Sequence, residues 1–121
     1  MNNASKHNLA DSSGRILFDP LVVADSFWAR AIGMLRYAEI APTFAMLLPQ
    51  CRAVHTFLMR FPIDIAFLSN DYRVVEVYPE VQAGRLITNR NRNGTHTLEA
   101  ASGAFHSVNL KHNDLLQIHE N

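Results

Sequence analysis

The chain has 121 residues, of which 48% are hydrophobic and 18% are charged, and this length and composition fit one globular domain. Its 11 basic and 11 acidic residues leave no net charge, which argues against nucleic acid or an anionic membrane surface as a partner. The single cysteine, Cys51, excludes an internal disulfide, and no apolar run predicts membrane insertion or a secretory signal, so we expect a soluble, cytoplasmic protein.

The first 14 residues are rich in Asn, Ser and Asp and lack apolar periodicity, which predicts a flexible N-terminal arm. Residues 15–121 then form the single domain. Residues 15–24 have the composition of a strand, but Pro20 predicts that this strand lies at an edge or bends.

A helix is predicted to begin after Asp25 or Ser26, because the apolar residues that follow recur every three or four positions as far as Leu35. Residues 43–48 form a short apolar run between two prolines, which predicts a buried strand.

The centre of the chain predicts a β-hairpin, with arms at 63–68 and 72–78 around the turn residues Asn70 and Asp71. Both faces of its first arm are largely apolar, so Asp64 is expected near an interior.

The rest of the chain predicts a mobile loop and further short elements. Residues 83–94 carry arginines, asparagines and glycines, which are typical of a loop. Residues 95–100 and 115–118 predict strands, and Ser102 is placed to begin a short helix.

About seven short strands and two helices, without a regular alternation of strand and helix, favour a mainly β fold. A sandwich or a small barrel with helices at its ends is expected, and an α+β sheet packed against helices is the alternative.

No residue pattern predicts a metal or cofactor. The 6 histidines include no pair at a metal-binding spacing, and Cys51 is expected to be an inert, half-buried thiol. The arginines at 85–92 have no aromatic residues among them, so this segment predicts a solvated loop and no nucleic-acid site.

Two carboxylates, Asp64 and Glu99, stand in apolar neighbourhoods, where burial raises the pKa of a carboxyl or requires a cationic partner. One interpretation is an ion pair that organises the fold, with Arg30 or Arg60 as the partner of Asp64. The other is a pocket for a small polar ligand, lined by His55, Arg60, Asp64 and Glu99.

The sequence also resembles the bacterial and archaeal family known as domain of unknown function 192 (DUF192), from about residue 21 to residue 118. The resemblance rests on an Arg-x-x-Gly-Met segment, a His-Thr-Phe-x-Met-Arg-x-Pro-x-Asp block and a late Leu-Glu-x-x-x-Gly. The residues that form these motifs, several of them expected to be structural, are Arg30, Gly33, Met34, His55, Thr56, Phe57, Met59, Arg60, Pro62, Asp64, Leu98, Glu99 and Gly103.

This resemblance implies a compact, mainly β domain and no established reaction, cofactor or catalytic residue. The segment 80–93 matches the family only loosely, so no role is transferred to it. The His-Thr-Phe variant resembles members found alongside pilus and secretion-machinery proteins.

Three hypotheses about function follow. The first is a non-enzymatic accessory domain that binds a small polar ligand or a protein segment. The second is a hydrolase-like enzyme in which Asp64 and Glu99 perform acid-base chemistry on one small polar substrate. The third is a structural module of an envelope assembly, with an exposed apolar patch or a free sheet edge.

Overall fold

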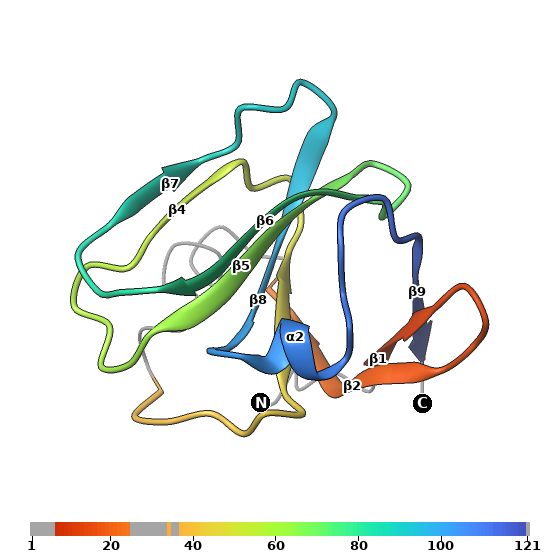
Figure 1. The fold of residues 1–121 in the computed structure, drawn as a ribbon, viewed down its shortest axis with the longest axis horizontal. Helices are drawn as coiled ribbons and strands as arrows, with labels where there is room; N and C mark the ends of the chain where they lie inside the picture. The colour runs from red at the N-terminus through yellow and green to blue at the C-terminus, as the bar shows by residue number, and fades with distance from the viewer. Residues whose placement is uncertain (1–6, 25–33, 35–36, 121) are drawn as a thin grey trace.

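The computed structural model describes residues 7–24, 34 and 37–120 of the chain. Strands dominate this part of the chain, and a single short helix lies near its C-terminal end (Figure 1). The strands are β1 (His7–Asp11), β2 (Ile16–Val23), β3 (Ala45–Leu48), β4 (Ala53–His55), β5 (Ile63–Ser69), β6 (Val74–Val81), β7 (Leu86–Thr88), β8 (Gly94–Ala101) and β9 (Leu116–Glu120), and the helix is α2 (Ala104–Ser107).

Seven strands form one sheet in the order β6-β5-β8-β3-β2-β1-β9, in which only the β2–β3 pair is parallel. The two edges of this sheet meet, because a backbone bridge joins Arg73, before β6, to Leu115, before β9. The N–H of Leu116 also donates to the Tyr72 carbonyl at 2.9 Å. The sheet therefore curls into a small barrel.

The barrel interior is apolar, since alternate residues of each strand point inward. Helix α2 covers one end of the barrel, and its Phe105 ring packs edge-on against Phe18 at a centroid distance of 6.1 Å. The fully buried interior residues include Leu9, Phe18, Leu21, Ala66, Leu68, Leu98 and Phe105.

A second apolar layer lies on the outer face of β3, β5 and β8. Strands β4 and β7 form a separate two-stranded ribbon, which turns Val54 and Ile87 toward this face. The buried residues of this second layer include Met34, Met46, Leu48, Met59, Ile63, Ile65 and Phe67. The large sheet is therefore buried on both faces at β5, which explains why the sequence of β5 is apolar at nearly every position.

The mainly β prediction is confirmed, and β5, β6, β3, β8 and β9 lie close to their predicted ranges. The predicted N-terminal arm requires correction, because residues 7–11 form β1 between β2 and β9. This strand contributes only Leu9 and Ala10 to the core, both with 0% exposure, so its sequence carries little apolar signal.

Two smaller expectations also change. The loop predicted at 83–94 contains β7, which pairs with β4. Pro20 lies in an interior strand, so the edge position is wrong, whereas the alternative of a bend agrees with an irregularity in the β1–β2 register at Pro20, where its missing N–H is tolerated. The helix predicted after Asp25 falls outside the described residues. No helix in the described part of the chain has the length and apolar character needed to cross a membrane.

Candidate functional site

Asp64 is fully buried at the end of the barrel where β8 leads into α2. Its Oδ1 accepts the backbone N–H groups of Glu80 at 2.8 Å and Gly103 at 3.2 Å, and its Oδ2 accepts that of Phe105 at 3.0 Å. Glu80, at an irregularity of β6, and Gly103, before α2, both have positive φ, which is uncommon for glutamate and ordinary for glycine. The carboxylate therefore holds two points at which the backbone departs from regular structure. Backbone donors, and not the side chain of Arg60, balance this buried charge.

Glu99 is 3% exposed and lies in the outer apolar layer, opposite Met46 on β3 and Ile65 on β5. Its Oε1 is buried without a hydrogen-bond partner in the described part of the chain. Burial raises the pKa of this carboxyl from 4.5 to about 7. Glu99 therefore exchanges a proton near neutral pH.

The structure does not gather the four residues expected to line one pocket. Asp64 pairs with Ala100 and points into the barrel, whereas Glu99, the next residue along β8, points to the outer face. His55 and Arg60 are exposed at the ribbon and at the loop that follows it. The two carboxylates therefore lie on opposite faces of the sheet, where one substrate does not reach both.

The loop after β4, residues 56–62, is held by Thr56, which is 0% exposed. The Thr56 hydroxyl donates to the Gln82 carbonyl at 2.7 Å and accepts the N–H of Arg85 at 2.9 Å. Its backbone carbonyl also accepts the N–H of Gly84 at 3.0 Å. The start of this loop is thereby fixed to the segment that enters β7.

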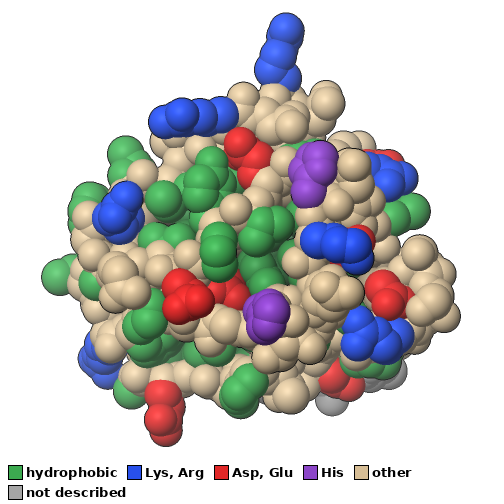
Figure 2. Space-filling view, in the orientation of Figure 1, with side chains coloured by type: hydrophobic (Ala, Val, Ile, Leu, Met, Phe, Trp, Pro, Cys, Tyr) green, Lys and Arg blue, Asp and Glu red, His purple; other side chains and the backbone are tan. Residues whose placement is uncertain are grey.

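Apolar side chains project into solvent from this fixed loop and from β7. Leu58 is 87% exposed, Leu86 63% and Phe57 49%, and the Phe57 ring stacks on His55 at 5.2 Å. Because His55 pairs with Leu86 across the ribbon and carries the Phe57 ring, these three residues lie on one outer face, and Leu58 is the next residue along the loop. We call His55, Phe57, Leu58 and Leu86 the ribbon patch. In Figure 2, hydrophobic side chains gather on the side of the molecule that holds β4, β5, β6 and β7.

Several motif residues have structural positions. Met34 and Met59 are buried in the outer layer, Pro62 precedes β5, and Gly103 has a φ of 86° immediately before α2. Among residues that we expected to be structural, Arg30 and Gly33 lie outside the described part of the chain. Cys51 is half-buried, and its thiol contacts the Ala53 carbonyl at 3.2 Å.

A polar cleft of about 670 Å³ lies where three loops meet. We call it the three-loop cleft. The turn from β5 to β6 supplies Asp71 and Arg73, and the other two loops contribute Arg92 and His112. Asp71 accepts the hydroxyl of Ser69, and this bond, together with the charge of Arg73, lowers the pKa of Asp71.

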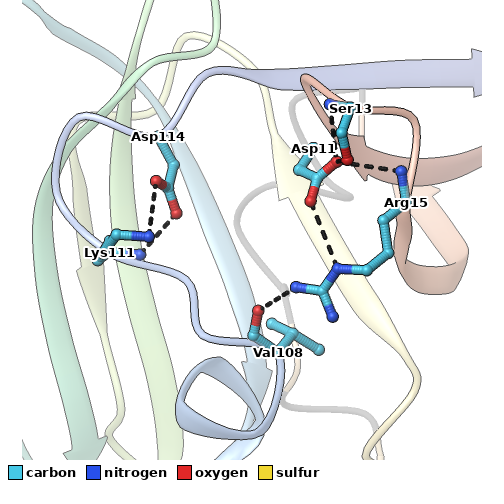
Figure 3. A network of polar contacts seen from close by, with 6 residues as sticks. All are labelled: Asp11, Ser13, Arg15, Val108, Lys111 and Asp114. Atoms are coloured by element: carbon cyan, nitrogen blue, oxygen red, sulfur yellow. Dashed lines mark hydrogen bonds and ion pairs between the residues drawn. The ribbon is translucent and has the colours of Figure 1, made fainter.

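A smaller cleft of about 190 Å³ lies between the β1–β2 turn and the segment after α2. Its charges are already paired (Figure 3): Arg15 contacts Asp11 at 3.4 Å, and Lys111 contacts Asp114 at 3.4 Å. The Arg15 guanidinium also donates to the Val108 carbonyl at 2.7 Å, which joins the β1–β2 turn to the end of α2. This network is structural, and the three-loop cleft is the better candidate for a ligand.

Sequence reasoning missed the ribbon patch and the three-loop cleft. In the sequence, the patch is represented by two adjacent apolar residues, Phe57 and Leu58, that follow Thr56. Nothing in the local pattern marks which apolar residues face outward. Within the ranges that the structure describes, no group of His, Cys, Asp and Glu side chains is arranged to hold a metal ion.

Comparisons with known proteins identify a family and two similar structures. The family model of DUF192, described as "Uncharacterized ACR", matches residues 10–118. The structure is similar to that of a protein of unknown function from Novosphingobium aromaticivorans, with a TM-score of 0.77, 19% identity, and coverage of 92% of this chain and 82% of that one.

A second similar structure is that of a "putative transcription regulator" from Sinorhizobium meliloti. It has a TM-score of 0.77 and 20% identity, and the match covers 96% of this chain and 97% of that one. No curated protein matches this chain. At these identities the likeness concerns the fold alone.

Proposed function

The chain belongs to the DUF192 family, which matches it over residues 10–118, and we propose that it is a non-enzymatic binding domain for a segment of a partner protein. The segment binds at the ribbon patch. It carries an apolar anchor flanked by acidic residues.

The observation that carries this proposal is the conformation of Leu58. This side chain is 87% exposed while its backbone has a φ of 68°, a region that costs a non-glycine residue about 1 kcal/mol or more. The exposed side chain of Leu58 adds nothing to the core, and the strained backbone does not serve to bury it. A residue that is strained and turned outward is typical of a position selected for contact with another molecule.

The patch is preorganised. Thr56 fixes the base of the loop through two side-chain hydrogen bonds, and Phe57 rests on the His55 ring. The apolar surface is therefore already ordered before a partner binds, which lowers the entropic cost of association. Three of the four large hydrophobic side chains that are exposed in the described part of the chain belong to this patch.

The charges around the patch define the chemistry of the partner. Arg60 lies in the loop after β4 and Arg85 precedes Leu86, and both side chains are exposed. Neither guanidinium makes a hydrogen bond or an ion pair within the described residues. Two unpaired cations beside an apolar surface favour a segment with acidic residues next to its anchor.

The geometry also favours binding over the alternative of a hydrolase-like enzyme. All the observed hydrogen bonds of Asp64 are with backbone N–H groups that shape the fold. Glu99 lies on the other face of the sheet. The pilus and secretion machinery implied by the resemblance is the first class of protein in which to seek the partner.

The proposal is tested with two synthetic peptides that share a Leu-Phe anchor, Asp-Glu-Leu-Phe-Asp-Glu and Lys-Lys-Leu-Phe-Lys-Lys. Each is titrated into ¹⁵N-labelled protein and followed by amide chemical shifts. We expect the acidic peptide to shift residues 55–60 and 85–86 selectively. The variant Leu58→Asn should lose this response while remaining folded, because asparagine tolerates positive φ.

Ile16→Thr is the matched control, since Ile16 is 47% exposed but lies on β2. The control should bind the acidic peptide as the wild type does. Equal binding of the basic peptide, or an equal loss in the control, would contradict the proposal, as would an acidic peptide that shifts no residue of the patch.

A further inference from the structure

We propose that the three-loop cleft is a second binding site, which takes a small polar molecule through a phosphate or carboxylate group. This site is separate from the ribbon patch, and the proposal does not depend on the function assigned to that patch.

The cleft is built on a rigid base. It lies where the barrel closes, and backbone hydrogen bonds of 2.8 Å run from Val74 to Asp114 and from Asn113 to Val74. The β5–β6 turn is closed by a further bond of 2.8 Å, from Ser69 to the Arg73 carbonyl. Two of the three loops are therefore joined by backbone hydrogen bonds, and Figure 1 shows the β5–β6 turn next to the segment that leads into β9.

The third loop is anchored separately. The N–H of Arg90 donates to the Glu76 carboxylate at 3.2 Å, and a side-chain N–H of Arg52 donates to the Asn91 carbonyl at 3.4 Å. The Asn91 side-chain oxygen accepts the N–H of Asn93 at 2.8 Å. The loop is thus held in place over the cleft while the amide NH₂ group of Asn91 keeps its donor capacity.

The lining has an excess of hydrogen-bond donors. A guanidinium has five N–H groups, and Arg73 shows one hydrogen bond from these, of 2.9 Å to the Asn113 carbonyl. Arg92 shows no hydrogen bond or ion pair within the described residues. The one carboxylate of the lining, Asp71, already accepts the Ser69 hydroxyl.

Two arginines facing one cleft match an oxyanion, because a guanidinium pairs with phosphate or carboxylate through two parallel hydrogen bonds. The volume of about 670 Å³ exceeds the space needed by a bare ion and lies in the range of small-molecule sites. The asparagines and Thr95 supply further polar contacts to the body of the ligand. The expected ligand is therefore a sugar phosphate or a hydroxy acid in size and polarity.

The test uses ribose 5-phosphate and citrate as separate probes, titrated into the ¹⁵N-labelled full chain at constant ionic strength. We expect at least one of them to shift residues 69–73, 91–95 and 112–113, and the arm that responds identifies phosphate or carboxylate as the recognised group. Arg92→Gln should weaken binding about tenfold or more, the loss expected for a charge-assisted contact.

Arg15→Gln is the matched control, because Arg15 is also exposed but lies at the β1–β2 turn, outside both the three-loop cleft and the ribbon patch. It should leave the affinity for the probe unchanged. Shifts spread over all arginines, equal weakening by both variants, or no response through the millimolar range would overturn the proposal. Tighter binding of a short RNA than of either probe would also overturn it, since the site would then recognise a polymer.

Discussion

Replacing Glu99 with glutamine is expected to remove a pH dependence of stability that this one buried carboxyl creates. In the folded chain its pKa is about 7, against 4.5 for a solvated glutamate. Between these two values the folded state holds a proton that the unfolded state has lost, so the free energy of unfolding decreases as the pH rises. The contribution is fully present below pH 4.5 and is lost as the pH passes through about 7.

The size of this effect follows from the difference between the two pKa values. Each pKa unit corresponds to 1.36 kcal/mol, so burying the ionised form of Glu99 costs about 3 kcal/mol above neutral pH. Glutamine has the shape and neutrality of the protonated acid. Glu99→Gln should therefore match the wild type near pH 4.5 and exceed its free energy of unfolding by up to about 3 kcal/mol at pH 8.

The assay is urea denaturation of both proteins between pH 4.5 and 8.5, followed by circular dichroism. The quantity to compare is the difference between the two free energies of unfolding at each pH. His96, whose pKa is lowered by burial, acts in the opposite direction but is present in both proteins, so its contribution cancels. A difference that does not change with pH would refute the reasoning that burial raises the pKa of Glu99 in the folded state.

Two other substitutions test the buried polar contacts. Asp64→Asn should lower the free energy of unfolding by about 2–4 kcal/mol. Both carboxylate oxygens of Asp64 accept backbone N–H groups, and the NH₂ group of asparagine would place a donor against one of these donors. The exposed Asp71→Asn should cost clearly less, because solvent screens the contacts of Asp71. Equal losses in urea denaturation would argue against a special role for Asp64. Thr56→Val keeps the side-chain shape but strands the Gln82 carbonyl and the Arg85 N–H, so we expect a loss of about 2 kcal/mol. An unchanged melting temperature for Thr56→Val would show that the loop holds without this hydroxyl.

The sequence predicted well the features that depend on local pattern. Alternating and continuous apolar runs placed the β5–β6 hairpin, and the apolar setting of Asp64 indicated its burial. The partners of Asp64 were not predictable in this way, because a backbone N–H has no signature in a side-chain sequence. The sequence also does not define the register in which β5 pairs with β8. A shift of one residue in this register would move every side chain of a strand to the opposite face of the sheet.

The ribbon patch and the three-loop cleft depend on long-range geometry, which the sequence shows even less directly. The sequence shows that Leu58 is apolar, but its outward orientation follows from a positive φ that the fold imposes. The three-loop cleft joins segments separated by about twenty residues each, and their meeting depends on closure of the barrel. Long-range geometry, more than residue type, determines both candidate sites.

Closure of the barrel has a consequence for how the chain folds. β1 lies between β2 and β9, and five residue pairs join β1 to β9 although more than a hundred positions separate them along the chain. While residues 116–120 are still inside a ribosome, the edge of β1 that pairs with β9 is free. A free strand edge can pair with the edge of another nascent chain. A truncation that removes β9 should therefore favour aggregation over a smaller, stable fold.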